Sequence, residues 1–266
     1  MSSVGRLRYL EGPPRGNVRP RGALVLIHAF PLNARMWQSQ LALADAGWHV
    51  LAPQLRGMDG GDSDPPATSI DDYAGDIIDL LDALHIDDAV IGGLSLGGYI
   101  TFAMFRHAPR YFRGMLLADT RPQTDTTEGL EGRKRMLLLV REKGPAGVAD
   151  EMIPRLLAGQ TRQDRLDIVE RVRALALANS SNAIAGAIAA MMTRQDSTPL
   201  LRAIHCPTLI VVGESDIVTP PAVSEEMHRA IPGSQLVGIK SAGHLSNLEQ
   251  PVAFNEALAR FLSHQV

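Results

Sequence analysis

The chain has 266 residues, a formal net charge of −3, 45% hydrophobic and 21% charged residues, and a single cysteine. This length allows one large domain or two small ones, the composition is typical of a well-buried core, and the single cysteine excludes an internal disulfide. A pI near 6.2 gives no electrostatic reason to expect nucleic acid or an anionic membrane as a partner. The first ten residues lack the apolar core of a signal peptide, and no stretch approaches the roughly 18 apolar residues of a membrane span. We therefore expect a cytoplasmic protein.

Short apolar runs alternate with helical patterns along most of the chain. Continuous apolar runs of four to six residues are typical of strands buried on both faces of a parallel sheet. Their alternation with helices predicts an α/β fold, with an open, mostly parallel sheet and helices on both of its faces. In chain order we predict strands at 23–27, 48–52, 88–92, 115–118, 208–212 and 235–239, and helices at 37–46, 69–84, from 98 onward and at 252–262.

Residues 121–199 interrupt this alternation, because they show helical patterns and no convincing strand. They also contain no Phe, Trp or Tyr. We interpret the segment as a helical cap (lid) inserted over the carboxyl ends of the strands, where open α/β sheets bind ligands. The core domain would then comprise residues 1–120 and 200–266. Ordinary helical packing elsewhere on the surface is the alternative. The expected cap helices cover 133–142, 148–157, 162–178 and 183–192.

Ser95 lies at the centre of a G-x-S-x-G pentapeptide, residues 93–97, between a predicted strand and a predicted helix. Strand, sharp turn and helix together form the context of a nucleophile elbow. A side chain two residues before or after the serine would collide with the crossing chain, so glycine is needed there. We therefore predict that Ser95 is a nucleophile whose hydroxyl is held above the sheet edge.

A serine hydroxyl needs a base to accept its proton, and the base needs an acid to orient it. His244 follows the last predicted strand and is the best candidate for the base. Asp216 follows the strand before it and completes the chain order Ser, Asp, His that accompanies the elbow. Its rival for the acid is Asp119, which ends the strand before the helical segment, and Glu214 is a weaker rival. If Asp216 is the acid, we expect Asp119 to be a hydrogen-bonding residue near the pocket mouth.

Two backbone amides are expected to bind the oxyanion. One belongs to Leu96, which follows the nucleophile at the N-terminus of a helix. The other belongs to Phe30, in the loop after the first buried strand, because the next residue, Pro31, has no N–H. His28 begins the same loop, and we expect it to shape the loop through side-chain hydrogen bonds.

These motifs together resemble the α/β-hydrolase family. The resemblance implies a sheet of about eight strands, a catalytic triad of Ser95, Asp216 and His244, no cofactor and no metal. Two departures concern loops near the site. Ala29 replaces the usual glycine of the oxyanion loop, and the loop 54–63 has Gln54 in place of an acid and one extra residue. The resemblance rests on residues 28–31, 93–98, 213–216 and 243–244.

Within this family the chain is most similar to small carboxylesterases and enol-lactonase-like hydrolases, through residues 119–121 and through 243–251, which include the possible pocket residue Leu245. The leading hypothesis is hydrolysis of small carboxylic esters through an acyl-enzyme, and the lack of aromatics in the helical segment favours short or medium acyl chains. A lactonase acting on a carboxylate-bearing ring is the alternative. It would need a cation, for which Arg121, Arg133, Lys134 and Arg135 are candidates.

Two further possibilities stay open on the sequence alone, and a third is disfavoured. A perhydrolase or haloperoxidase side activity would use the same residues. A non-catalytic small-molecule binding protein could also retain them, and turnover would distinguish it from an enzyme. A dehalogenase is disfavoured, because that chemistry needs an aspartate where Ser95 stands. The natural substrate and the choice between monomer and homo-oligomer cannot be predicted from these patterns.

Overall fold

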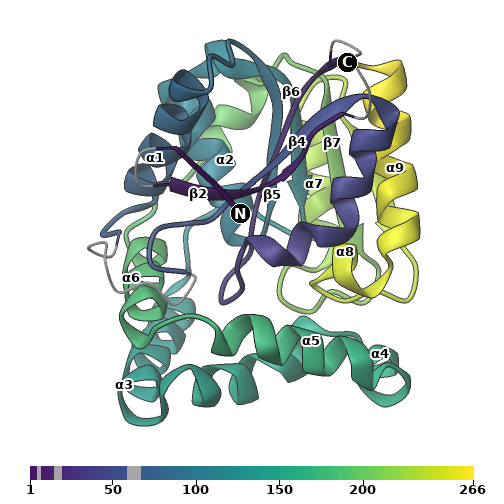
Figure 1. Ribbon diagram of the computed structural model, residues 1–266. Coiled ribbons are helices and arrows are strands. Elements are labelled where there is room, and N and C mark those ends of the chain that lie inside the picture. The colour runs from purple at the N-terminus through teal and green to yellow at the C-terminus, as the bar shows by residue number, and fades with distance from the viewer. Residues whose placement is uncertain (5–6, 15–19, 59–66) are drawn as a thin grey trace.

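The computed structural model describes residues 1–4, 7–14, 20–58 and 67–266. Its centre is an eight-stranded sheet with the order β1-β2-β4-β3-β5-β6-β7-β8 (Figure 1). The expected open, mostly parallel α/β sheet is therefore confirmed. The strands are β1 (Ser2–Val4), β2 (Leu7–Gly12), β3 (Gly22–Ile27), β4 (Trp48–Pro53), β5 (Ala89–Leu94), β6 (Phe112–Ala118), β7 (Thr208–Gly213) and β8 (Gln235–Ile239).

Strands β3 to β8 all run parallel, whereas β1 pairs antiparallel with β2, and β2 antiparallel with β4. The sequence analysis did not predict β1 and β2. Buried and exposed residues alternate along β2, because it lies near the sheet edge with one face toward solvent. It therefore lacks the continuous apolar run that marks the central strands.

Helices cover both faces of the sheet. Alternate residues of β3 belong to different hydrophobic clusters, Val25 and Ile27 to one and Leu24 and Leu26 to the other. The first cluster includes buried residues of α1 (Ile70–Ala83), α2 (Leu96–His107) and α7 (Pro221–Ala230). The second includes those of η1 (Ala34–Ala46) and α9 (Pro251–His264). Each face of the sheet is thus buried by its own layer of helices.

Two predicted helices show that the local sequence pattern predicts the position of a helix but not its hydrogen-bond type. The helix expected from Ser69 is present as α1, with a capping box in which Ser69 and Asp72 each bond the other's backbone amide. The helix expected at 37–46 is a 3-10 helix that begins at Ala34 and ends against Gly47 in the left-handed region. Spacing of apolar residues does not distinguish the two hydrogen-bond patterns.

Between β6 and β7 the chain contains helices and no strand. The α-helices there are α3 (Thr127–Leu156), α4 (Gly159–Asp164), α5 (Leu166–Leu177) and α6 (Ser181–Met192). The backbone of α3 is interrupted at Gly144, where φ is 63°, at the break predicted between 142 and 148. The helix predicted over 162–178 is divided at Arg165, where the backbone is non-helical. Residues 121–199 are called the helical segment below.

The helical segment lies beyond one end of the sheet in Figure 1. The remaining short elements are η2 (Pro109–Tyr111), η3 (Thr198–Ala203) and α8 (Ser246–Glu249). In the described ranges no single helix is long and apolar enough to cross a membrane. Helices α5 and α6 meet that criterion only when taken together, and they are bent by 92°. The assignment of 121–199 as a separate cap domain stays a prediction.

Candidate active site

Ser95 occupies a sharp turn between β5 and α2, with φ 56° and ψ −111°. Two close backbone approaches require the glycines on either side of it. A Cβ on Gly93 would lie 2.5 Å from the carbonyl carbon of Gly97, and one on Gly97 would lie 2.1 Å from the carbonyl oxygen of Ile27. Any side chain at either position would displace backbone. The turn therefore has the geometry expected of a nucleophile elbow.

The backbone of Ser95 is fixed from the neighbouring strand. Its amide donates to the carbonyl oxygen of Ala118 at 3.0 Å, and its carbonyl oxygen accepts from the hydroxyl of Thr120 at 2.9 Å. Ser95 is partly exposed, whereas the residues immediately before and after it are buried. The hydroxyl is therefore carried by a rigid backbone at the only partly accessible position of residues 93–97.

Asp216 and His244 lie in contact at the carboxyl ends of β7 and β8. The Nδ1 atom of His244 is 2.8 Å from Oδ2 of Asp216, and both side chains are almost fully buried. The other carboxylate oxygen, Oδ1, accepts from the amides of Val218 at 2.7 Å and Thr219 at 3.0 Å. The hydroxyl of Thr219 also donates to Oδ2 at 2.7 Å. The imidazole thus faces a carboxylate that three other donors hold in place.

This environment keeps Asp216 ionised. Burial by itself would raise the pKa of Asp216, but the charge of His244 and hydrogen bonds from His244 and Thr219 lower the pKa below its ordinary value. An ionised carboxylate at Nδ1 fixes the tautomer in which Nε2 is free to accept a proton. Asp216 and His244 can therefore act together as an orienting acid and a general base.

Asp119 is fully buried at the end of β6, but it contacts different groups. Its Oδ1 accepts from the amide of Gly213 at 2.8 Å, and its Oδ2 accepts from the hydroxyl of Ser246. Burial, and then the nearby charge of Asp216, raise the pKa of Asp119 well above its ordinary value. The structure thus brings Asp216, rather than Asp119, to His244. Glu214, the weaker rival, is exposed.

The amides expected to bind the oxyanion belong to buried residues, Phe30 and Leu96. Leu96 is the first residue of α2, where amides have no partner within the helix. In the part of the chain that the structure describes, neither amide donates a hydrogen bond. Both are thus left for an external acceptor. Ala29, beside Phe30, is buried and donates its own amide to the sulfur of Met36 at 3.2 Å.

His28 and Gln54 organise the loops behind Phe30. Burial lowers the pKa of His28 to about 4, so its ring is neutral. Nδ1 lies 3.1 Å from the carbonyl oxygen of Ala29, and Nε2 accepts from the amide of Leu55 at 3.2 Å. Gln54 accepts from the amide of Ala34 and donates to the carbonyl oxygen of Met58. Residues 59–63 of this loop lie outside the described residues.

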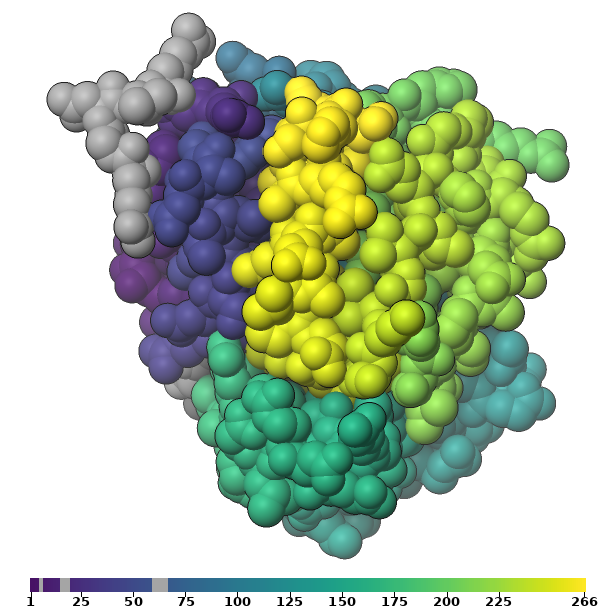
Figure 2. All heavy atoms as spheres, turned by 90° about the vertical axis from the view of Figure 1, so that its right-hand side faces the viewer, coloured from purple at the N-terminus to yellow at the C-terminus, as the bar shows by residue number. Residues whose placement is uncertain are grey.

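The helical segment packs directly against the loops that carry these groups. Asn179, before α6, donates to the carbonyl oxygens of Pro31 and Leu32 next to Phe30. On the other side, the amide of the buried residue Leu245 donates to the carbonyl oxygen of Leu156 at 3.2 Å. Figure 2 shows the helical segment, in teal, lying against the yellow C-terminal part of the chain. The segment therefore contacts both the oxyanion loop and the loop of His244.

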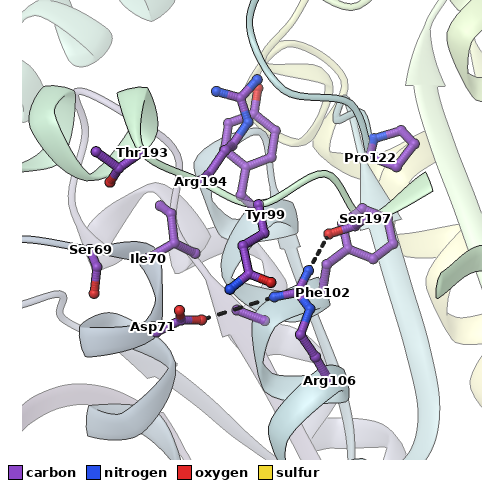
Figure 3. Close-up of a pocket in the computed structure, with 12 residues that line it drawn as sticks. Ser69, Ile70, Asp71, Tyr99, Phe102, Arg106, Pro122, Thr193, Arg194 and Ser197 are labelled. Carbon is purple, nitrogen blue, oxygen red and sulfur yellow. Dashed lines mark hydrogen bonds and ion pairs between the residues drawn. The ribbon is translucent and has the colours of Figure 1, made fainter. Parts of the chain in front are cut away.

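A separate pocket of about 50 Å³ lies between α1, α2 and residues 193–197. Figure 3 shows Arg194 near the ring of Tyr99, and Arg106 between Ser197 and Asp71. None of the residues predicted for the site lines this pocket. Among the described residues no cluster of His, Cys, Asp or Glu could hold a metal ion.

Sequence reasoning missed three side chains that support the site: Thr219, Ser246 and Glu249. Each lies within five residues of Asp216 or His244 along the chain. Glu249 carried no distinct signal, because it stands between other polar residues, Asn247 and Gln250, and its burial cannot be read from the sequence. The other two are small polar residues in loops, where such residues are common.

Comparison with known proteins gives the family. A model described as the alpha/beta hydrolase family matches residues 24–257. The chain belongs to this family. It is 30% identical over 238 residues to 3-oxoadipate enol-lactonase 2 of Acinetobacter baylyi, covering 90% of this chain and 87% of that protein. The α/β-hydrolase resemblance expected from the motifs is therefore confirmed.

Solved structures show the same fold. A thermophilic esterase from Thermogutta terrifontis, with malate bound, has a TM-score of 0.90 and 36% identity, covering 97% of this chain and 93% of that one. The enol-lactonase from Burkholderia xenovorans has a TM-score of 0.86 and 26% identity, covering 97% and 96%. The chain is thus a hydrolase of the α/β fold that is similar to both esterases and enol-lactonases.

Proposed function

We propose that this α/β hydrolase cleaves small carboxylic esters with Ser95 as nucleophile, through an acyl-enzyme intermediate. The observation that carries the proposal is the buried contact of 2.8 Å between His244 and Asp216 at the sheet edge where the strained Ser95 turn also lies. Similarity to a thermophilic esterase over nearly the whole chain supports the same reaction class.

In the first half-reaction, Oγ of Ser95 attacks the ester carbonyl carbon while Nε2 of His244 accepts the hydroxyl proton. The amides of Phe30 and Leu96 bind the negative charge that develops on the carbonyl oxygen. The intermediate collapses when the C–O bond to the alcohol breaks and His244 donates its proton to the leaving oxygen. In the second half-reaction, His244 takes a proton from water, the hydroxide attacks the acyl carbon, and Ser95 leaves with that proton.

The test compares the wild-type protein with Ser95→Ala. We expect hydrolysis of p-nitrophenyl butyrate and covalent labelling by a fluorophosphonate in the wild type, and neither in the variant, whose fold is checked by circular dichroism. Labelling without turnover would mean that the nucleophile is reactive but the acyl group is wrong. A folded wild-type protein that is neither labelled nor active would overturn the proposal in favour of a binding protein.

The charged groups where the two ends of the helical segment meet favour a carboxylate-bearing lactone as a second candidate substrate. Arg121, Arg133 and Arg194 all contact one carboxylate, Asp125, so this cluster carries a formal surplus of positive charge. Arg121 directly follows Thr120, whose hydroxyl bonds the Ser95 carbonyl. The relative from Acinetobacter baylyi is named as an enol-lactonase, which agrees with this candidate.

Of the four cations considered from sequence, Lys134 pairs with Glu131 on an exposed face and Arg135 is exposed, which leaves Arg121 and Arg133. Arg121→Gln should raise KM for a carboxylate-bearing enol lactone and leave KM for its methyl ester unchanged. An equal rise of KM for both substrates would mean that Arg121 does not bind the substrate carboxylate.

A further inference from the structure

Glu249 is a buried carboxylate that the proposed mechanism does not use. It ends the short helix α8, five residues after His244 in the chain, and only 2% of its surface is exposed. No ion pair found among the described residues involves it. A buried carboxylate must be satisfied by hydrogen bonds, because an unpaired one costs several kcal/mol or protonates. The question is which groups it satisfies.

Its two oxygens bind backbone amides from two different parts of the molecule. Oε1 accepts from the amide of Gly243, immediately before His244, at 2.8 Å. Oε2 accepts from the amide of Ala158, in the helical segment between α3 and α4, at 2.9 Å. Burial raises the pKa of Glu249, while hydrogen bonds that include the side chain of Thr161 in α4 oppose that rise. One carboxyl group thus bridges the loop of His244 and the helical segment.

The backbones on either side of this bridge are in direct contact. A Cβ on Gly243 would lie 2.6 Å from the amide nitrogen of Ala158, so glycine is required for this approach. On the other side of His244, the amide of Leu245 donates to the carbonyl oxygen of Leu156. Both neighbours of His244 are therefore fixed to the junction of α3 and α4, one through Glu249 and one directly.

We propose that Glu249 is a positioning residue that holds the loop of His244 against residues 156–161, so that the helical segment forms part of the frame that orients the base. This inference rests on the proposed function for its effect on turnover. It does not require Glu249 to touch substrate. Its consequence is that the helical segment helps to fix the direction of the His244 imidazole.

The test compares Glu249→Ala and Glu249→Gln with Asp125→Asn. The side chain of Asp125 is also almost fully buried, and it pairs with Arg194 of the same segment, which lies over Tyr99 of α2 (Figure 3). It makes no contact with the His244 loop among the interactions of the described residues. The substrate is p-nitrophenyl butyrate, whose neutral acyl group offers no carboxylate to the arginines around Asp125.

We expect Glu249→Ala to lower kcat by about 100-fold with KM changed by less than about threefold, because misplacing a catalytic group by about 1 Å costs this much. The amides of Gly243 and Leu245 should exchange with solvent at least about tenfold faster. The reason is that opening of the His244 loop no longer has to break the hydrogen bonds that Glu249 makes. Glu249→Gln keeps one acceptor oxygen and should lie between the wild type and Glu249→Ala. Asp125→Asn should lower the melting temperature and leave the exchange of these two amides near wild type.

Equally accelerated exchange at Gly243 and Leu245 in Glu249→Ala and Asp125→Asn at equal loss of stability would overturn the proposal, as would unchanged exchange at these amides in Glu249→Ala. If Glu249→Ala does not fold, Glu249→Gln decides by the same measurements. Failure of the proposed function looks different, because the wild type would then show neither turnover nor labelling of Ser95. In that case amide exchange alone decides whether Glu249 holds the His244 loop.

Discussion

The carboxyl edge of the sheet and the helical segment that lies against it are built on different principles. At the sheet edge, glycines allow backbones to approach closely, and carboxylates such as Asp216 and Asp119 bind backbone amides. Within the helical segment, small apolar side chains fill the core, and arginines gather around Asp125. The first arrangement fixes atoms by steric contact and short hydrogen bonds. The second relies more on ion pairs between long side chains, which tolerate small displacements.

The largest expected effect lies at the sheet edge. Asp216→Asn should lower kcat by about 10⁴-fold, because the amide no longer stabilises the imidazolium and favours the wrong tautomer of His244. The matched control is Asp119→Asn, which changes the other buried carboxylate of this edge. It should reduce kcat by less than about tenfold, since Asp119 bonds Gly213 and Ser246 rather than His244. The measurement is steady-state kinetics with p-nitrophenyl butyrate. If Asp119→Asn lowered kcat more than Asp216→Asn, the roles assigned to the two carboxylates would be exchanged.

The close backbone approach at the same edge predicts a second effect, on stability. A Cβ on Gly213 would lie 2.0 Å from the carbonyl oxygen of Gly243, beside His244. Gly213→Ala must therefore shift backbone, and we expect it to lower the free energy of unfolding by about 3 kcal/mol. Urea unfolding measures this change. A loss below about 0.5 kcal/mol would show that the edge is less tightly packed than the contact implies.

The contribution of the helical segment to stability should depend strongly on pH. Burial opposes ionisation of Asp125, but Arg194 and Arg133 lower the pKa of Asp125 from 3.8 to about 2. A depressed pKa stabilises the folded state above the unfolded pKa, and this stabilisation is lost as pH falls toward 2. Between pH 5 and pH 2, the wild type should lose about 2 kcal/mol more unfolding free energy than Asp125→Asn. If the unfolding free energies of the two proteins fell equally between pH 5 and pH 2, the lowered pKa of Asp125 would be contradicted.

The smallest expected effect comes from a glycine in α3 that has room for a side chain. The nearest atom to a Cβ on Gly132 is a guanidinium nitrogen of Arg135 at 3.8 Å. Because glycine is a poor helix former, Gly132→Ala should raise the free energy of unfolding by about 0.5–1 kcal/mol. Thermal unfolding measures the gain. A loss instead of a gain would mean that the segment is packed as tightly as the sheet edge.

The sequence by itself determined the central strands, the elbow around Ser95 and the order of the site residues. Continuous apolar runs mark strands buried on both faces, and close approach of backbones at a sharp turn leaves glycine as the residue that fits. Both signals are local, so they can be read without the fold. The outer strands β1 and β2 gave no such signal, because β1 has only three residues, and β2 has alternating burial and pairs antiparallel with β4, which is distant in the chain.

Only the tertiary structure decided which carboxylate faces His244 and what Glu249 contacts. Asp119, Asp216 and Glu249 are all buried carboxyl groups near one sheet edge. The chain order Ser, Asp, His favoured Asp216 over Asp119 as the partner of His244, but it predicted no contact for Glu249. Their partners are set by the parallel order of β6, β7 and β8 and by the packing of residues 156–161 on the loop of His244. Hydrogen bonds between residues about 90 positions apart depend on that packing, and no local pattern encodes them.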